Sequence, residues 1–258
     1  MNILVCIKQV RDPERSFVLD DEQLWIREDQ NVSYVMSPYD EYALEEALRI
    51  KEALLGTVVD VITVGPERAS EVIRRALGMG ADNGIHTLTS STGFQGPFAV
   101  ASAIAKSVSQ KKYDLYLTGV MSADLNQALV GPMLAELMSL PIATAVVERR
   151  LSEDLRTVTV QRELEGGLRG ILEMSLPAVL TIQSGINTPR YPTLSNMLRA
   201  KKQPLEIIDL KNQPTNGSRQ ELIRLRSPEK TRQGLLLEGT QREKARQLIE
   251  ILQAKALL

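Results

Sequence analysis

The chain contains one cysteine, one histidine and few aromatic residues among its 258 residues. A single cysteine excludes an internal disulfide and is typical of a reducing compartment. No apolar run reaches the roughly 18 residues that a membrane-spanning helix requires. The opening apolar run at 3–7 is too short for the core of a signal peptide and has no basic residues before it, so it predicts a first strand. We therefore expect a cytoplasmic protein.

Neither sign of charge predominates, since 31 basic and 32 acidic residues give a net charge of −1. This balance provides no global attraction to nucleic acid or to anionic membranes. The local balance differs between Arg199 and Arg232, where nine basic residues accompany four acidic ones. Because aromatic residues other than Tyr191 do not interleave with these cations, the pattern does not indicate nucleic-acid binding.

Recognisable catalytic motifs are also missing. The chain has no Cys/His cluster for zinc, no phosphate-binding loop ending in Gly-Lys-Ser/Thr and no Gly-x-Ser-x-Gly turn. Cys6 lies in a strand-like run without a histidine partner, which predicts an inert thiol. His86 is interpreted as a structural strand residue, and the acid pair Glu45-Glu46 as a solvated helix face. These features favour a binding or carrier subunit over an enzyme.

Apolar runs of strand length alternate with segments of helical period, which predicts an α/β fold with a parallel sheet covered on both faces. The helix after Ser37 has a particularly clear start: Ser37 at the N-cap, Pro38 at the first position and Asp40 as the acid of a short capping box. Strands are expected at 2–8, 58–64, 85–88 and 115–117, and helices at 37–55, 67–77, 98–109 and up to about 140.

After Pro141 the pattern changes to strands at 144–147, 157–162, 171–174 and 178–182, which are expected to extend the same sheet. A short helix at 194–202 follows. From Lys201 the chain is polar and interrupted by turn-forming residues, and it ends in a helix that begins with a Thr240…Glu243 capping box. We therefore expect two parts, an α/β domain at 1–200 and an extended arm with a helix at 201–258. Such a helix often packs on its own chain, but the length and polarity of the arm favour a helix that clasps another chain. The turn-forming residues are Pro204, Pro214, Asn216, Gly217 and Pro228.

Parallel sheets bind ligands outside the carboxyl ends of their strands, where loop amides and helix N-termini meet. The strongest candidate is the loop 118–131, in which Gly119 and Gly131 would allow close backbone approach and Ser122, Asn126 and Gln127 offer hydrogen-bonding groups. A helix N-terminus there would favour a phosphate. Many loops of this kind bind nothing, so a nucleotide site and an empty turn both remain open on spacing alone.

The stretch 181–202 has the character of a docking device. Its loop contains Gly185, Pro189 and Pro192 and presents Leu194 at the start of a basic helix that Thr193 can cap. The leucine is flanked by Arg190, Arg199, Lys201 and Lys202, and such cations could orient a partner. The alternative is that Leu194 and Leu198 simply pack on their own domain.

Several segments, in order along the chain, resemble the β subunit of electron transfer flavoprotein. The resemblance covers about residues 1–210, and its most specific part is Arg-Glu-Leu-Glu-Gly-Gly followed by Leu-Pro-Ala-Val and Pro-Arg-Tyr. The matching segments are 3–10, 37–40, 44–47, 64–66, 76–82, 118–119, 131–133, 162–167, 176–181 and 187–191 with Leu194.

The resemblance implies a Rossmann-like sheet, and a heterodimer whose α subunit holds most of an FAD that carries electrons from dehydrogenases to an acceptor. It further implies a structural AMP in this chain and a recognition loop at about 183–200, where a buried leucine contributes about 2 kcal/mol to a brief complex. By position, the docking residues are Tyr191, Leu194, Met197 and Arg199. The implied AMP-binding residues are Cys6, Ser37, Pro38, Tyr39, Asp40, Val64, Gly65, Ser122, Asp124, Asn126, Gln127, Ala128, Leu129, Val130 and Gly131.

One departure from the family pattern concerns the loop before Gly131. The family usually has Gln-Thr or Gln-Val there, whereas this chain has Leu129-Val130, which predicts fewer polar contacts to phosphates. The difference argues against the electron-bifurcating branch, in which a second FAD replaces AMP. That branch and a free-standing nucleotide-binding module are the alternatives to the carrier subunit.

Overall fold

The chain divides into two compact units, Met1–Arg224 and Leu225–Leu258. The first unit contains a nine-stranded sheet. The structure is a computed structural model. It describes residues 1–15, 18–20, 25–27, 32–90, 93–210, 219–226 and 234–257.

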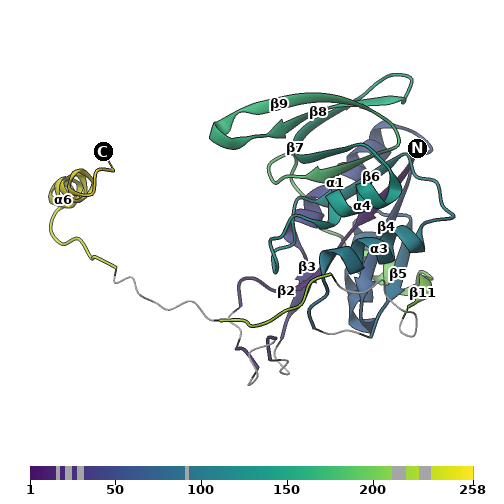
Figure 1. The fold of residues 1–258 in the computed structure, drawn as a ribbon, viewed down its shortest axis with the longest axis horizontal. Helices are drawn as coiled ribbons and strands as arrows, with labels where there is room; N and C mark the ends of the chain where they lie inside the picture. Colours follow the sequence, from purple (N-terminus) through teal and green to yellow (C-terminus); the bar gives the residue numbers. More distant parts are fainter. Residues whose placement is uncertain are drawn as a thin grey trace. The chain divides into compact units, whose positions relative to one another are not determined.

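The sheet has the spatial order β11-β5-β4-β1-β6-β10-β7-β8-β9. Figure 1 shows β8 and β9 at one end of it and β5 and β11 at the other. Neighbouring strands are parallel from β11 to β7 and antiparallel from β7 to β9, which confirms the predicted mostly parallel sheet with added strands. The strands are β1 (Asn2–Cys6), β4 (Val58–Gly65), β5 (Asn83–Leu88), β6 (Leu115–Gly119), β7 (Ile142–Leu151), β8 (Thr157–Glu163), β9 (Arg169–Ser175), β10 (Ala178–Ile182) and β11 (Glu206–Asp209).

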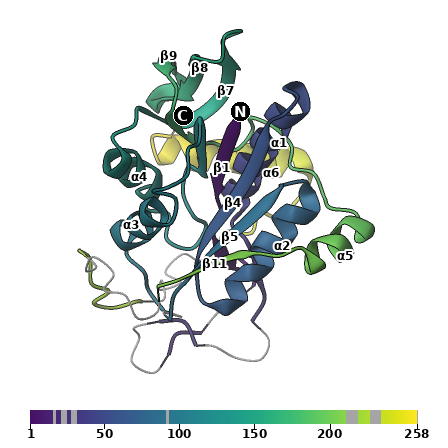
Figure 2. The same ribbon diagram turned by 90° about the vertical axis from the view of Figure 1, so that its right-hand side faces the viewer.

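Both faces of the central strands are buried under helices. In β1, Ile3 and Val5 belong to one apolar cluster and Leu4 and Cys6 to the other, since successive side chains point to opposite faces. Figure 2 shows α1, α2 and α5 on one side of the sheet and α3 and α4 on the other. The helices are α1 (Pro38–Ala53), α2 (Ser70–Met79), α3 (Pro97–Ser107), α4 (Val130–Met138) and α5 (Leu194–Lys202), with 3-10 turns η1 (Glu67–Ala69) and η2 (Glu165–Gly167).

Three short strands were not expected from the sequence. β2 (Gln9–Arg11) and β3 (Tyr34–Met36) form a separate antiparallel pair, and β11 adds a parallel edge next to β5. Ile207 of β11 is 63% exposed, so this strand lacks the continuous burial that marks the central ones. The predicted turns at Pro214, Asn216-Gly217 and Pro228 lie outside the described residues. The role of 201–258 as a partner-binding arm stays a prediction.

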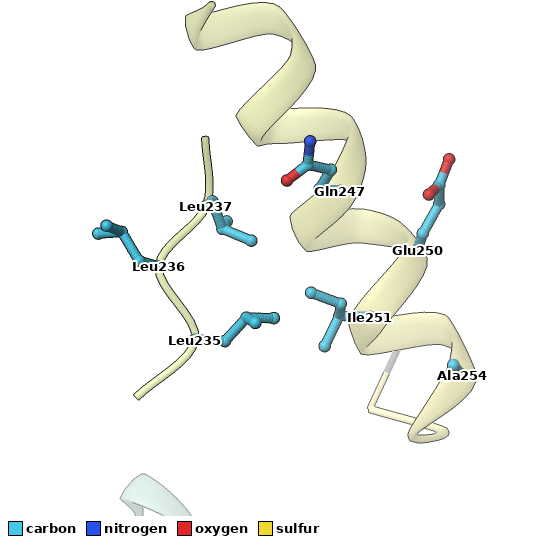
Figure 3. Close-up of a pocket in the computed structure, with 7 residues that line it drawn as sticks. All are labelled: Leu235, Leu236, Leu237, Gln247, Glu250, Ile251 and Ala254. Carbon is cyan, nitrogen blue, oxygen red and sulfur yellow. The ribbon is translucent and has the colours of Figure 1, made fainter. Parts of the chain in front are cut away.

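The second unit contains the predicted C-terminal helix, α6 (Gln241–Ala254). Its capping box forms as expected, because the Thr240 side chain accepts from the Glu243 amide and the Glu243 carboxylate accepts from the Thr240 amide. The extended segment 235–237 runs beside the helix, and Leu235 and Ile251 point toward one another (Figure 3). No residue of α6 is buried. None of the described helices combines the length and the apolar character that crossing a bilayer requires.

Gly84 in β5 offers a test of the packing between α2 and the sheet. A Cβ atom at this position would lie 2.2 Å from Cγ2 of Ile73 and 2.8 Å from Cδ2 of Leu205. We expect Gly84→Ala to lower the free energy of unfolding by about 2 kcal/mol, because overpacking forces neighbouring side chains to move. Urea denaturation measures the change. Gly93→Ala is the matched control, since no atom of the described residues lies within 4 Å of its Cβ position. Equal effects of the two substitutions would contradict this packing.

Candidate functional site

The carboxyl ends of β1, β4 and β6 lie side by side and bring most of the predicted nucleotide-binding residues to one edge of the sheet. Cys6 pairs in register with Ile62 of β4 and with Thr118 of β6. Because these strands are parallel, Gly65 and Gly119 end β4 and β6 at the same edge as Cys6. We call this the carboxyl edge. The start of α1 joins it through hydrogen bonds to Lys8 and Gly119.

Asp40 is the side chain that connects these segments. Its two carboxylate oxygens accept hydrogen bonds from the Lys8 amide (2.8 Å) and from the Gly119 amide (3.0 Å). Asp40 is only 6% exposed. Burial raises the pKa of Asp40 to about 7, although the two amide hydrogen bonds and the charge of Lys8 act in the opposite direction.

Ser37 occupies the N-cap position of α1 as predicted, but its side chain does not make the expected capping hydrogen bond. α1 begins after Ser37 with Pro38 at its first position, but no side chain caps its N-terminus. The Ser37 hydroxyl instead accepts from the amide of Ala123 at 3.3 Å. The predicted capping pair Ser37 and Asp40 is therefore used to attach α1 to the strand ends and the loop after β6.

The loop after β6 is fastened to β1 by an ion pair. Lys8 Nζ lies 2.8 and 2.7 Å from the two carboxylate oxygens of Asp124 and 3.4 Å from the hydroxyl of Ser122. The pair is partly exposed, so it contributes modestly to stability. Its main consequence is electrostatic, because the ammonium group at this edge already has an anionic partner within the chain.

At the two glycines expected to admit a ligand, the space beside the Cα atom is filled by other residues of the chain. A Cβ at Gly119 would lie 2.6 Å from Asp40 Oδ1 and 2.7 Å from the Cβ of Tyr39. A Cβ at Gly131 would lie 2.5 Å from Cγ2 of Thr181 in β10. Both glycines therefore permit close packing of α1 and α4 against the strand ends, which is a different role from the predicted one.

The exposed part of the loop carries the remaining predicted polar groups. Asn126, Gln127 and Ala128 are exposed, and Asn126 and Ala128 adopt positive φ angles of 51° and 53°. Leu129, half-buried, occupies the N-cap position of α4 and supplies no side-chain cap. Two carboxamide residues thus precede a helix N-terminus, whose first amides have no partner within the helix, and donors of these kinds suit an anion.

The described residues contain few groups suited to nucleophilic or metal chemistry. Cys6 is buried, and desolvation, with a smaller contribution from the Asp40 charge, raises the pKa of its thiol. His86 is 3% exposed, and its Nε2 lies 3.2 Å from the Gly65 carbonyl oxygen. Within the described ranges, no three His, Cys, Asp or Glu side chains gather in a way that could hold a metal ion.

The residues predicted to dock a partner lie on and before α5, in a segment at 187–200 that we call the docking segment. Thr193 caps α5 as predicted, accepting from the Asn196 amide. Tyr191 is 84% exposed and Leu194 77%, and Arg199 is also exposed. Met197 is half-buried, with its sulfur 2.6 Å from the Cβ position of Gly78 on α2.

Leu198 replaces Met197 as the outward apolar residue of this segment, and it is 55% exposed. It was not among the predicted docking residues. Its spacing from Leu194 could have revealed it, because residues four apart lie on the same face of a helix.

The interpretation of the acid pair on α1 as a solvated face is wrong. Glu45 and Glu46 are not solvated, since their side chains are 5% and 7% exposed and pair with Arg190 and Arg149 respectively. Arg190 is correspondingly engaged with Glu45 and Glu52, and these interactions raise its pKa. The guanidinium of Arg190 thus pairs with residues of its own chain. The other cations predicted to orient a partner, Arg199, Lys201 and Lys202, are exposed.

Asp40 predicts a specific pH dependence of stability. Because its pKa is higher in the folded chain than its ordinary value of 3.8, its contribution to the unfolding free energy is fully present at low pH. That contribution is lost as the pH rises from about 4 to about 7, by roughly 1 kcal/mol per pH unit. We expect Asp40→Asn to flatten the fall in unfolding free energy over this range, measured by urea denaturation at several pH values. Asp154→Asn is the control, since Asp154 is exposed. If the unfolding free energy of Asp40→Asn fell with pH as steeply as that of the wild type, the pH dependence could not be assigned to Asp40.

Comparison with known proteins identifies the family of this chain. Residues 24–212 match the model of the electron transfer flavoprotein domain. The chain is 31% identical to electron transfer flavoprotein subunit beta of Bacillus subtilis over 99% of both chains. It is 34% identical to the mitochondrial subunit beta of Arabidopsis thaliana, covering 92% of this chain and 93% of that one. It is 36% identical to the Homo sapiens subunit beta over 81% of each. The chain therefore belongs to the electron transfer flavoprotein family and, within it, to the beta subunits.

Proposed function

We propose that this chain is a non-catalytic subunit of a heterodimer that carries electrons from dehydrogenases to an acceptor by means of FAD held mainly by an α subunit. The observation that carries the proposal is the similarity to beta subunits over nearly the whole chain. FAD, when bound in the heterodimer, supplies the reversible uptake of electrons. The residues of this chain bind AMP and the α subunit, and they orient the electron-donating dehydrogenase.

The carboxyl edge is proposed to hold AMP. The amides at the start of α4 and the side chains of Asn126 and Gln127 fit an anionic phosphate. Two features keep this site weakly polar. Lys8 is paired with Asp124, and Leu129 supplies no hydrogen bond. A mononucleotide with one phosphate places a smaller demand on such a site than the pyrophosphate of a second FAD.

The second compact unit is proposed to pack on the α subunit. All of α6 is at least partly exposed, and Leu248 and Ile249 are each about half exposed. The segment beside it adds Leu235 and Leu236, which are 72% and 83% exposed. An amphipathic helix with no buried residue gains its stability from apolar contacts with another surface. A subunit partner supplies that surface.

The docking segment is proposed to bind the electron-donating dehydrogenase. Tyr191, Leu194 and Leu198 form its apolar part, and exposed Arg199, Lys201 and Lys202 follow on the same helix. Large exposed apolar side chains next to cations suit an apolar recess with an acidic rim. The apolar residues provide the contact energy, and the charges speed and orient the encounter.

Co-expression with an α subunit tests the proposed assembly. We expect a one-to-one heterodimer that releases one FAD and one AMP per complex on denaturation, because the carboxyl edge suits a single phosphate. Size-exclusion chromatography with light scattering measures the assembly, and chromatography of the released nucleotides counts the cofactors. Two FAD per complex would replace the carrier by the bifurcating alternative. A monomer that ignores the α subunit would favour a free-standing nucleotide-binding module.

Leu194→Ala tests docking in the same heterodimer. The electron donor for the assay is whichever of a panel of flavoprotein dehydrogenases reduces the wild-type complex fastest. We expect the KM for that donor to rise about thirtyfold, because a buried leucine is worth about 2 kcal/mol at such a contact. Flavin content and reduction by dithionite should not change. Leu55→Ala is the matched control, since Leu55 is 100% exposed and lies outside the docking segment. Equal KM values for the two variants would rule out docking through Leu194.

A further inference from the structure

The start of the docking segment is bound to α1 by a buried carboxylate. Arg190 Nε and Nη2 lie 2.8 and 2.9 Å from the two oxygens of Glu45, and the Arg190 amide donates to the same carboxylate at 3.1 Å. Arg190 Nη1 reaches Glu52 at 2.5 Å. Three hydrogen bonds thus join one side chain of α1 to both the backbone and the side chain of Arg190, which fixes the direction in which the chain leaves residue 190.

A second contact with α1 lies three residues earlier. Asn187 Nδ2 donates to Glu46 (2.9 Å) and to the carbonyl oxygen of Tyr42 (3.0 Å). Glu46 also forms an ion pair with Arg149 of β7, with 2.8 Å between the atoms. Adjacent residues of α1 therefore hold adjacent parts of the loop that follows β10.

The other end of the segment is held by α2. Arg74 Nη1 donates to the carbonyl oxygen of Ala200 at 2.8 Å and also to that of Gln203. Ala200 is buried, and Met197 packs at Gly78. Between these two attachments Tyr191, Leu194 and Leu198 project outward. The segment is thus fixed at both ends while its middle is exposed.

In this ion pair the Glu45 side chain is buried and the Arg190 side chain is one-third exposed. Such a pair contributes little net stability, because the desolvation of its charges offsets their attraction, but it restricts geometry closely. A segment that is already ordered loses less conformational entropy when a partner binds. We propose that Glu45 and Arg190 are positioning residues that hold the docking segment in its binding conformation, so that Leu194 meets the electron donor without prior ordering. This inference rests on the docking function proposed above.

Arg190→Gln in the heterodimer tests the inference, because glutamine cannot bind both carboxylate oxygens as a guanidinium does. We expect amide hydrogen exchange at 190–199 to accelerate about tenfold while exchange in β1 and β4 stays at the wild-type rate. The KM for the donor used with Leu194→Ala should rise by a similar factor, with kcat and dithionite reduction retained. Arg156→Gln is the matched control, since its ion pair with Asp154 is exposed. Arg190→Lys keeps the charge and should recover part of the wild-type KM.

The outcomes separate this inference from the docking function. If Leu194→Ala raises the KM but Arg190→Gln changes neither the KM nor the exchange rates, docking stands and the positioning role is overturned. If Arg190→Gln accelerates exchange while neither variant alters the KM, the docking function fails and the positioning role with it. If Arg190→Gln does not assemble, Arg190→Lys and Glu45→Gln take its place, and wild-type exchange and KM in both would overturn the inference.

Discussion

The buried carboxylates of α1 are the interactions on which the rest of this structure depends. Asp40 accepts from amides of the β1 and β6 ends, and Glu45 and Glu46 accept from side chains more than 140 residues later in the chain. A buried carboxylate without partners costs several kcal/mol, so each one can be accommodated only where its donors are in place. The position of α1 and the positions of those donors are therefore fixed together.

Much of the fold could be predicted because most of its strands are buried on both faces. Continuous apolar runs such as Ile3–Ile7 exclude a solvated surface, and the helical segments between them imply parallel connections. β11 escaped prediction for the opposite reason. It is short and half polar, and it becomes a strand through its pairing with β5. Local sequence carries little information about such an edge, whose structure depends on a neighbour far away in the chain.

The location of the candidate site was predictable, whereas the partners of its side chains were not. Parallel topology alone brings Cys6, Gly65 and Gly119 to one edge. Ser37 and Asp40 look like a capping box in sequence, but amides from other segments compete for their oxygens. Glu45 and Glu46 look solvated because their partners, Arg190, Asn187 and Arg149, are remote in sequence. Met197 and Leu198 are equally apolar neighbours, and only the space above Gly78 decides which of them turns inward.

The arrangement on α1 also restricts how the chain can change in length. Successive side chains of an α-helix are rotated by about 100° around the helix axis. If one residue were inserted or deleted between Asp40 and Glu45, one of the two carboxylates would therefore rotate away from its donors while the other kept them. Substitutions on the outer surface of α1 do not change the angle around the helix axis between the Asp40 and Glu45 side chains. A change in the number of residues between 40 and 45 does change that angle. The number of residues between Asp40 and Glu45 is therefore constrained. This constraint links the geometry of the carboxyl edge to that of the docking segment.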